Sequence, residues 1–134
     1  MKYTRIPSDE LEKLEDEFVN FLVVNGITAD DWVAIKENEP MNAAEIVDQF
    51  SDVVWESILR KTKYLNKIED QSAYYFKCDL EKIFLIKIDK REEGAEQLST
   101  SKEYHTIREL ELFEMIQNGC TISEGEEFEK LNLA

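Results

Sequence analysis

The side chains best suited to chemistry are one histidine, two cysteines and thirty carboxylates. His105 lies in the segment SKEYHTIRELE, near Glu103 and at helical i, i+4 spacing from Glu109. A zinc site needs three or four ligands and often more than one histidine or cysteine, and Cys78 and Cys120 are distant in the sequence. We therefore predict no metal ion and no cofactor, and interpret His105 as a helix-surface residue.

The sequence contains no familiar catalytic motif. Its four glycines are scattered rather than gathered in a phosphate-binding loop, and no Gly-x-Ser-x-Gly pattern surrounds a serine. The acidic clusters at 15–17, 30–31 and 126–127 are expected on exposed turns or helix starts, where a solvated surface or capping accounts for them. We name no catalytic residue and favour a non-enzymatic protein, and leave open an enzyme whose site is assembled only in three dimensions.

Positive charge gathers in one part of this acidic chain, around KIFLIKIDKR at 82–91. The net charge is −14, yet residues 60–91 hold 9 basic and 5 acidic side chains, against 4 and 14 in residues 1–59 and 3 and 11 in residues 92–134. Lysines on strands resist edge-to-edge pairing, which is the explanation we favour. A site for a protein or an anionic ligand is the alternative, and the overall negative charge disfavours nucleic acid.

The bulk composition is typical of a folded domain. The chain has 134 residues, of which 43% are hydrophobic and 10% aromatic, enough for a single domain with its own core. No stretch approaches the roughly 18 apolar residues of a membrane span, and the start lacks the apolar core of a signal peptide. We expect a cytoplasmic protein without a membrane partner, in which Cys78 and Cys120 are reduced and buried.

The first sixty residues have helical periodicity. A helix is expected from Ser8, as its N-cap, to the Asn25-Gly26 stop, and a short one over 29–38, with Thr28 and Asp31 at capping-box spacing and Pro40 as its end. The longest helix is expected over 43–60. Its inward stripe would be Ile46, Val47, Phe50, Val53, Val54 and Ile58.

From about residue 62 the period changes to that of strands. The runs 63–69, 73–78 and 82–89 are rich in aromatic and branched residues and are separated by polar breaks, which predicts a three-stranded antiparallel meander over about 62–89. A loop over 90–101, a helix over 102–118 with Ile107 facing inward, an extended Thr121-Ile122 pair and a last short helix would follow. The predicted fold is α+β, with N-terminal helices, the meander and C-terminal helices in one compact domain, residues 1–134.

Two classes of function fit this architecture. Trp55 and Leu59 lie at i, i+4, away from the main apolar stripe of their helix, so they are either sandwiched within the fold or form a surface for a protein partner or a homodimer. A non-enzymatic interaction or regulatory domain with that surface is our first hypothesis. The alternative is a small-ligand-binding protein or enzyme with a pocket between sheet and helices. Its polar lining would be Tyr74, Tyr75, Lys87 and His105.

Several segments together resemble one protein family. They are MKYTRI at the start, EFVNFL followed by GITADDW at 26–32, FSDVVWESIL at 50–59, KYLNKIE from Lys63, and FEMIQNGCTIS at 113–123. The resemblance is to short uncharacterised bacterial proteins, mainly from Bacteroidetes, and it covers most of the chain, least clearly 91–101. Since the family has only an unknown-function label, it implies a bacterial, cytoplasmic, stand-alone domain and supplies no catalytic or binding residue.

Overall fold

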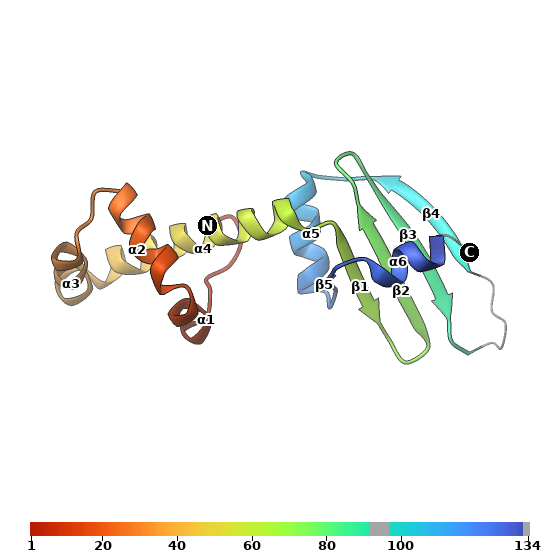
Figure 1. Ribbon diagram of the computed structural model, residues 1–134. Coiled ribbons are helices and arrows are strands. Elements are labelled where there is room, and N and C mark those ends of the chain that lie inside the picture. Colours follow the sequence, from red (N-terminus) through yellow and green to blue (C-terminus); the bar gives the residue numbers. More distant parts are fainter. Residues whose placement is uncertain (92–96, 133–134) are drawn as a thin grey trace. The chain divides into compact units, whose positions relative to one another are not determined.

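The computed structural model describes residues 1–91 and 97–132 and has an α+β fold. The chain divides into two compact units, Met1–Ser57 and Ile58–Ala134. The first is helical, and the second contains a β-sheet with two helices (Figure 1). Each unit is described by itself, and the single-domain organisation expected from the sequence stays a prediction.

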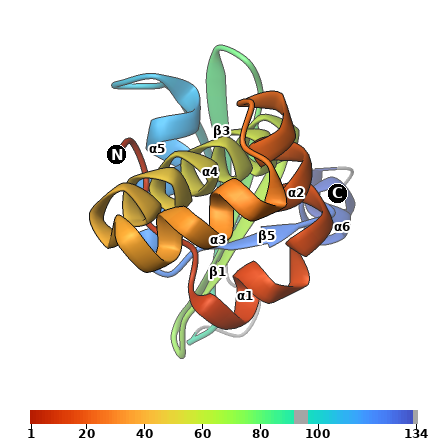
Figure 2. The ribbon, with the colours of Figure 1, turned by 90° about the vertical axis from the view of Figure 1, so that its left-hand side faces the viewer.

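The helical unit contains α1 (Ser8–Lys13), α2 (Glu15–Val24), α3 (Ala29–Asn38) and most of α4 (Pro40–Lys61). The single helix expected from Ser8 to Asn25 is wrong, because the chain breaks at Leu14 and Pro7 takes the N-cap position. The break places three carboxylates in the first turn of α2, where the positive end of the helix dipole stabilises them. Figure 2 shows the four helices of this unit.

Helix ends in this unit follow their sequence signals. The predicted capping box is confirmed, since Asp31 N–H donates to Thr28 Oγ1 at 3.1 Å and Thr28 N–H donates to the Asp31 carboxylate at 3.1 Å. Gly26 takes a φ of 75° just after α2, a conformation that favours glycine. Pro40 begins α4 rather than only ending α3, as suits a residue that lacks a backbone donor.

The core of the helical unit is aromatic. Phe18 lies at its centre, with the Trp32 and Phe50 rings edge-on at centroid distances of 5.1 and 5.0 Å. Leu22 and Ile46 complete the buried cluster. Two members of the predicted α4 stripe are corrected, since Val53 and Ile58 are exposed.

An N-terminal strap, residues 2–6, lies along α4. The backbone N–H groups of Lys2 and Tyr3 both donate to the Asp52 carboxylate, at 2.7 and 2.8 Å. Ile6 N–H donates to Ser51 Oγ at 3.0 Å, and Tyr3 and Ile6 are buried. The strap therefore extends the unit's core along the face of α4 that carries Ser51 and Asp52.

The second unit contains a five-stranded antiparallel sheet of order β4-β3-β2-β1-β5. The strands are β1 (Tyr64–Ile68), β2 (Ser72–Cys78), β3 (Lys82–Asp89), β4 (Leu98–Glu103) and β5 (Thr121–Ser123). The predicted meander corresponds to β1–β3. The strand count of three was wrong, because β4 and β5 pair with the two edges of that meander.

The two added strands carry weak sequence signals. All six residues of β4 are exposed, so its sequence LSTSKE has no buried face to set an alternating pattern. Of the loop expected over 90–101, residues 92–96 lie outside the described residues, while 98–101 belong to β4, so that part is corrected. The helix expected from 102 is also corrected: α5 spans Arg108–Gln117, with Ile107 exposed before it. The predicted extended pair at 121–122 is confirmed as part of β5, and α6 spans Glu126–Asn132.

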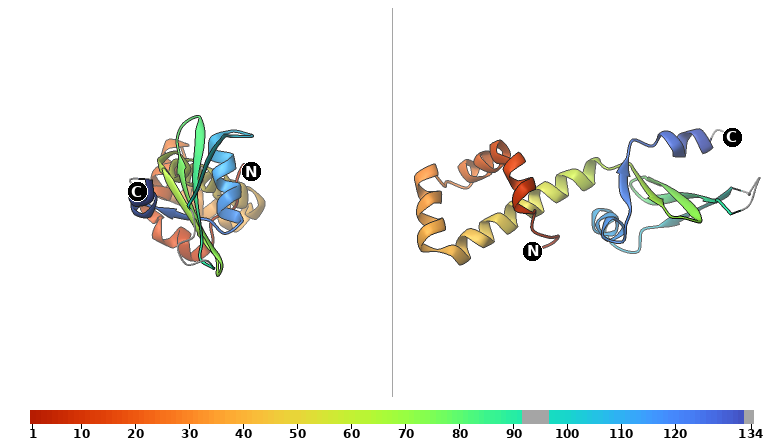
Figure 3. Two further views of the ribbon diagram at one scale, coloured as in Figure 1. Left: turned by 90° about the vertical axis from the view of Figure 1, so that its right-hand side faces the viewer. Right: turned by 90° about the horizontal axis from the view of Figure 1, so that it is seen from below.

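The two helices of this unit cover opposite faces of the sheet (Figure 3). Residues opposite each other on antiparallel strands share a face, so Tyr64, Lys77 and Phe84 point to one side. The Phe128 ring of α6 packs on Tyr64 at a centroid distance of 6.0 Å, which identifies this side as the α6 face. The α5 face carries the buried Leu65 and Ile83.

Candidate functional site

The clearest candidate site is a hollow of about 770 Å³ in the sheet unit, where the β2–β3 turn meets the end of α4 and the start of α5. Five cationic side chains line this basic hollow: Arg60, Lys63, Lys77, Lys82 and Arg108. Asp79 and Glu81 are its only acidic lining residues within 1–91 and 97–132. A chain of net charge −14 thus surrounds one cavity with an excess of positive charge.

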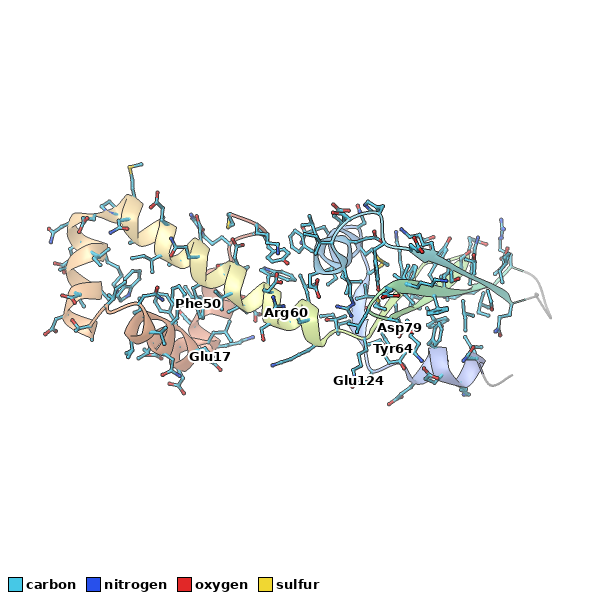
Figure 4. The ribbon with its side chains drawn as sticks, turned by 90° about the horizontal axis from the view of Figure 1, so that it is seen from above. Glu17, Phe50, Arg60, Tyr64, Asp79 and Glu124 are labelled. Carbon is cyan, nitrogen blue, oxygen red and sulfur yellow. The ribbon has the colours of Figure 1, made fainter. Side chains whose placement is uncertain are left out.

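Two aromatic rings also line the basic hollow. Tyr64 and Phe84 are both on the α6 face, and Figure 4 marks Tyr64 together with Arg60 and Asp79. Lys77 Nζ lies 6.0 Å from the centre of the Tyr64 ring. A lining that combines rings with cations suits a ligand that is both planar and negatively charged.

Lys77 is partly neutralised by α6. Its Nζ lies 3.1 Å from the Glu129 carboxylate, which also accepts a hydrogen bond from Tyr64 Oη at 2.6 Å. These hydrogen bonds raise the pKa of Lys77 and of Tyr64 and lower the pKa of Glu129. Lys63 and Lys82 are exposed and enter no salt bridge within the described ranges, so they are the cations most open to a ligand.

Arg108 has a different role, because its donors are already used. Its guanidinium donates to the carbonyl oxygens of Leu59, Thr62, Cys78 and Asp79, and its side chain is only 9% exposed. These carbonyls belong to the end of α4, the link to β1, the end of β2 and the β2–β3 turn. Arg108 therefore fixes the walls of the basic hollow and adds charge to it, rather than offering free donors to a ligand.

Cys78 lines the basic hollow but is a poor nucleophile. Burial raises the pKa of its thiol to about 12, so that almost none is thiolate near neutral pH. Burial likewise raises the pKa of Cys120. The expectation of two buried free thiols is confirmed, and both are chemically protected in the folded unit.

A second, smaller hollow of about 260 Å³ lies between α5 and the sheet. Its buried Glu111 accepts hydrogen bonds from Lys102 Nζ at 2.9 Å and from the backbone N–H of His105 at 2.7 Å. His105 Nδ1 lies 2.5 Å from the same carboxylate, and Nε2 lies 3.4 Å from Glu114. Burial raises the pKa of Glu111, but these hydrogen bonds outweigh it and hold the pKa below its ordinary value.

The four residues expected to line a ligand pocket are divided between the two faces of the sheet. Tyr74 and Lys87 are cross-strand partners on the α5 face, with Lys87 Nζ 5.4 Å from the ring centre. Tyr75 follows Tyr74 on the same strand and so points to the α6 face. His105 is 61% exposed and lies at the second hollow, before α5 begins rather than on a helix.

The two residues expected to form a partner surface also differ. Leu59 has no exposed surface, so of the alternatives open at the sequence level it is sandwiched in the core. Trp55 is half-buried, with the Tyr3 ring of the N-terminal strap 6.5 Å away. A partner contact at Trp55 stays a prediction, and Leu59 offers no side chain for it.

Further features were searched for in residues 1–91 and 97–132. No group of three or more His, Cys, Asp or Glu side chains there is arranged to hold a metal ion. No single helix in this part of the chain has the length and apolar character to cross a membrane, and only α2 with α3, bent by 95°, meet that test as a pair.

Comparison with known proteins identifies a family and no activity. The model of a family of unknown function, DUF6495, matches residues 1–100 and 90–134, which together take in the whole chain. No curated protein and no solved structure matches. The unknown-function label expected from the sequence is therefore confirmed, whereas the bacterial source and cytoplasmic location stay predictions.

Proposed function

The chain belongs to the DUF6495 family of unknown function, and from that premise, which supplies no activity, we propose that the protein is a non-enzymatic binding module for a planar, anionic small molecule. The observation that carries the proposal is the basic hollow with two aromatic rings, Tyr64 and Phe84, in its lining. Its volume of about 770 Å³ lies in the range of small-molecule pockets, roughly 300–1,000 Å³. Its charge is opposite to that of the chain as a whole.

The chemistry of the lining favours binding over catalysis. Cys78 is protonated at neutral pH, Arg108 is held by carbonyl groups, and His105 lies at the second hollow instead. A general base or an activated nucleophile would need a suitably tuned pKa beside the ligand. Lys63 and Lys82 instead supply positive charge on flexible side chains, which suits recognition of a phosphate, sulfonate or carboxylate.

The experiment compares two fluorescent probes that share the same rings. One is 1-anilinonaphthalene-8-sulfonate, and the other is N-phenyl-1-naphthylamine, which lacks the sulfonate. We expect the sulfonate probe to bind at one site and the neutral probe to bind at least tenfold more weakly. Binding of the sulfonate probe should weaken as salt rises, because the attraction is screened.

Matched charge reversals locate the binding. The double variant Lys63→Glu/Lys82→Glu should weaken binding of the sulfonate probe by about tenfold or more, since each reversal turns an attraction into a repulsion. Lys13→Glu, on exposed α1 in the other unit, changes the charge in the same way and should leave binding unchanged. Equal affinity for the two probes, or equal effects of the two variants, would contradict the proposal.

A further inference from the structure

Helix α2 carries three exposed apolar side chains. Val19, Val23 and Val24 are 49%, 66% and 85% exposed, and Val19 and Val23 follow each other at i, i+4 on one face. The adjacent side of the same helix, roughly 100° round its axis, buries Phe18 and Leu22 in the aromatic core. The helix is therefore apolar over a wide arc, and the helical unit buries only part of it.

The stability of α2 does not account for these valines. A β-branched side chain loses rotamer freedom in a helix, so alanine, glutamate or lysine would favour the helix more at an exposed position. Leaving apolar surface in water is also unfavourable. An exposed valine pair that the fold does not require points to contact with something outside this unit.

Acidic side chains precede the valines on the same face. Glu15 and Asp16 stand at i−4 and i−3 from Val19, and both are exposed. Neither forms a salt bridge within the described residues, and Met1–Ser57 holds 4 basic and 14 acidic side chains. The surface thus combines an apolar stripe with unneutralised negative charge at one end.

We propose that this valine face (Val19 and Val23) docks a cationic amphipathic helix of a partner protein. The partner's apolar i, i+4 stripe would pack on Val19 and Val23, and its lysines or arginines would reach Glu15 and Asp16. A second copy of the same helical unit would bring like charge against like charge. Anionic membranes are disfavoured for the same reason, since helices that lie on them carry Lys and Arg on the polar face.

The size of the surface sets the strength of the contact. The ten residues of α2 span about 15 Å, which is shorter than a standard protein interface. Binding is therefore weak, in roughly the micromolar range. This site is independent of the basic hollow, which lies in the other unit, so the two proposals stand or fall separately.

The experiment uses two labelled synthetic peptides of eighteen residues with one amphipathic pattern, either leucine and lysine or leucine and glutamate. Fluorescence anisotropy should show binding of the Leu/Lys peptide and not of the Leu/Glu peptide. The variant Val19→Ala/Val23→Ala should lower the affinity for the Leu/Lys peptide about tenfold, because two pairs of methyl groups are removed from the contact. Its Tm should stay the same or rise, which separates lost docking from lost folding.

Two further variants complete the test. Val53→Ala removes an exposed valine from α4 and should leave peptide binding unchanged. Glu15→Gln/Asp16→Asn should weaken binding and reduce its salt dependence. If Val19→Ala/Val23→Ala binds the Leu/Lys peptide with wild-type affinity, the proposal is overturned and only non-specific attraction to an acidic protein is left. If the valines instead mediate binding to phosphatidylglycerol vesicles or self-association, the proposal is overturned in favour of a lipid or a second copy.

Discussion

The helical unit and the sheet unit place their charged groups differently. None of the charged side chains in Met1–Ser57 is buried, although the unit carries 14 carboxylates. The sheet unit buries Glu111 and almost all of Arg108, and each is held by several hydrogen bonds. Most charges of the first unit can therefore be exchanged with little cost, the exception being Asp52, which holds the N-terminal strap, whereas the second unit depends on specific polar contacts inside it.

The two cores differ in the same sense. The helical core is built from aromatic rings around Phe18, whereas the sheet core is mainly aliphatic, with two thiols. Both tryptophans, Trp32 and Trp55, fall in the helical unit, and both cysteines, Cys78 and Cys120, fall in the sheet unit. Tryptophan fluorescence therefore reports on one unit and thiol labelling on the other.

The largest effect that we expect is from Phe50→Ala. This change removes a buried ring that packs on Phe18 and Phe21 and should cost about 4 kcal/mol. Denaturation followed by tryptophan fluorescence should shift to much lower denaturant, since Trp32 packs on the same cluster. The denaturant midpoint measured by labelling of Cys78 and Cys120 should stay at its wild-type value if each unit is stable by itself.

The control for that change is Phe50→Leu, which keeps most of the buried volume and should shift the fluorescence transition less. A joint shift of fluorescence and thiol labelling would break the comparison between the units. It would mean that the chain unfolds as one cooperative body, as the single-domain prediction implies.

The next largest effect is expected in the sheet unit, from Arg108→Met. Removing the guanidinium leaves buried carbonyls without their donor, at a cost of about 3 kcal/mol. Thiol labelling should shift to lower denaturant while tryptophan fluorescence does not. Arg108→Lys keeps the charge but reaches fewer carbonyls, so an intermediate shift is expected, and wild-type behaviour in both variants would show that the buried hydrogen bonds contribute little.

The sequence predicted local signals better than pairing. The Thr28–Asp31 box, the Asn25-Gly26 stop and the three central strands were correct, because each depends on residues close together in the chain. β4 was missed, because an exposed edge strand owes its conformation to hydrogen bonds from β3 and not to its own pattern. The break at Leu14 was missed because the apolar spacing continues through it.

The candidate site was predicted only as a charge excess. The concentration of lysines in 60–91 was visible, and Lys63, Lys77 and Lys82 do line the basic hollow. Arg108 and the buried Glu111 were not predicted, because both lie in a charged helix sequence where nothing local separates a buried ion from a surface one. The role of Arg108 depends on the carbonyl groups of Cys78 and Leu59, which are 30 and 49 residues away in the sequence.

A matched pair of glycine substitutions sharpens the comparison at smaller cost. Gly125 has a φ of 85°, and an added Cβ would lie 2.4 Å from the Tyr64 ring, so Gly125→Ala should cost about 2 kcal/mol in the sheet unit. Gly26 has a φ of 75° with open space around it, so Gly26→Ala should cost only about 1 kcal/mol in the helical unit. If the two variants lose equal stability, measured by thiol labelling for Gly125→Ala and by fluorescence for Gly26→Ala, the Tyr64 ring must move aside at little cost.

Displacement of Tyr64 in Gly125→Ala has a second consequence. Because this ring lines the basic hollow, the variant should also bind the sulfonate probe more weakly. Gly26→Ala should bind it normally. The pair therefore links packing in the sheet unit to the proposed function.

The smallest effect concerns pH and the buried carboxylate. Because the folded-state pKa of Glu111 lies below its unfolded value of about 4.3, its contribution is complete above that value and is lost as pH falls through the folded pKa. Wild-type thiol labelling with 4,4′-dithiodipyridine, which still reacts with thiols in acid, should therefore shift to lower denaturant between pH 6 and pH 3. Glu111→Gln should lose about 1 kcal/mol at pH 6 and show a flatter pH dependence.

Asp48 provides the comparison from the helical unit. Its pKa is also lowered, by the hydrogen bond from Arg5 Nε at 2.6 Å, but this pair joins the N-terminal strap to α4 at the surface, with the Arg5 side chain 54% exposed. Solvent screens such a pair, so Asp48→Asn should barely change the fluorescence transition at either pH. If Asp48→Asn flattened the pH dependence as much as Glu111→Gln, burial would not be what separates the two units, since an exposed ion pair would then couple to folding as strongly as an enclosed one.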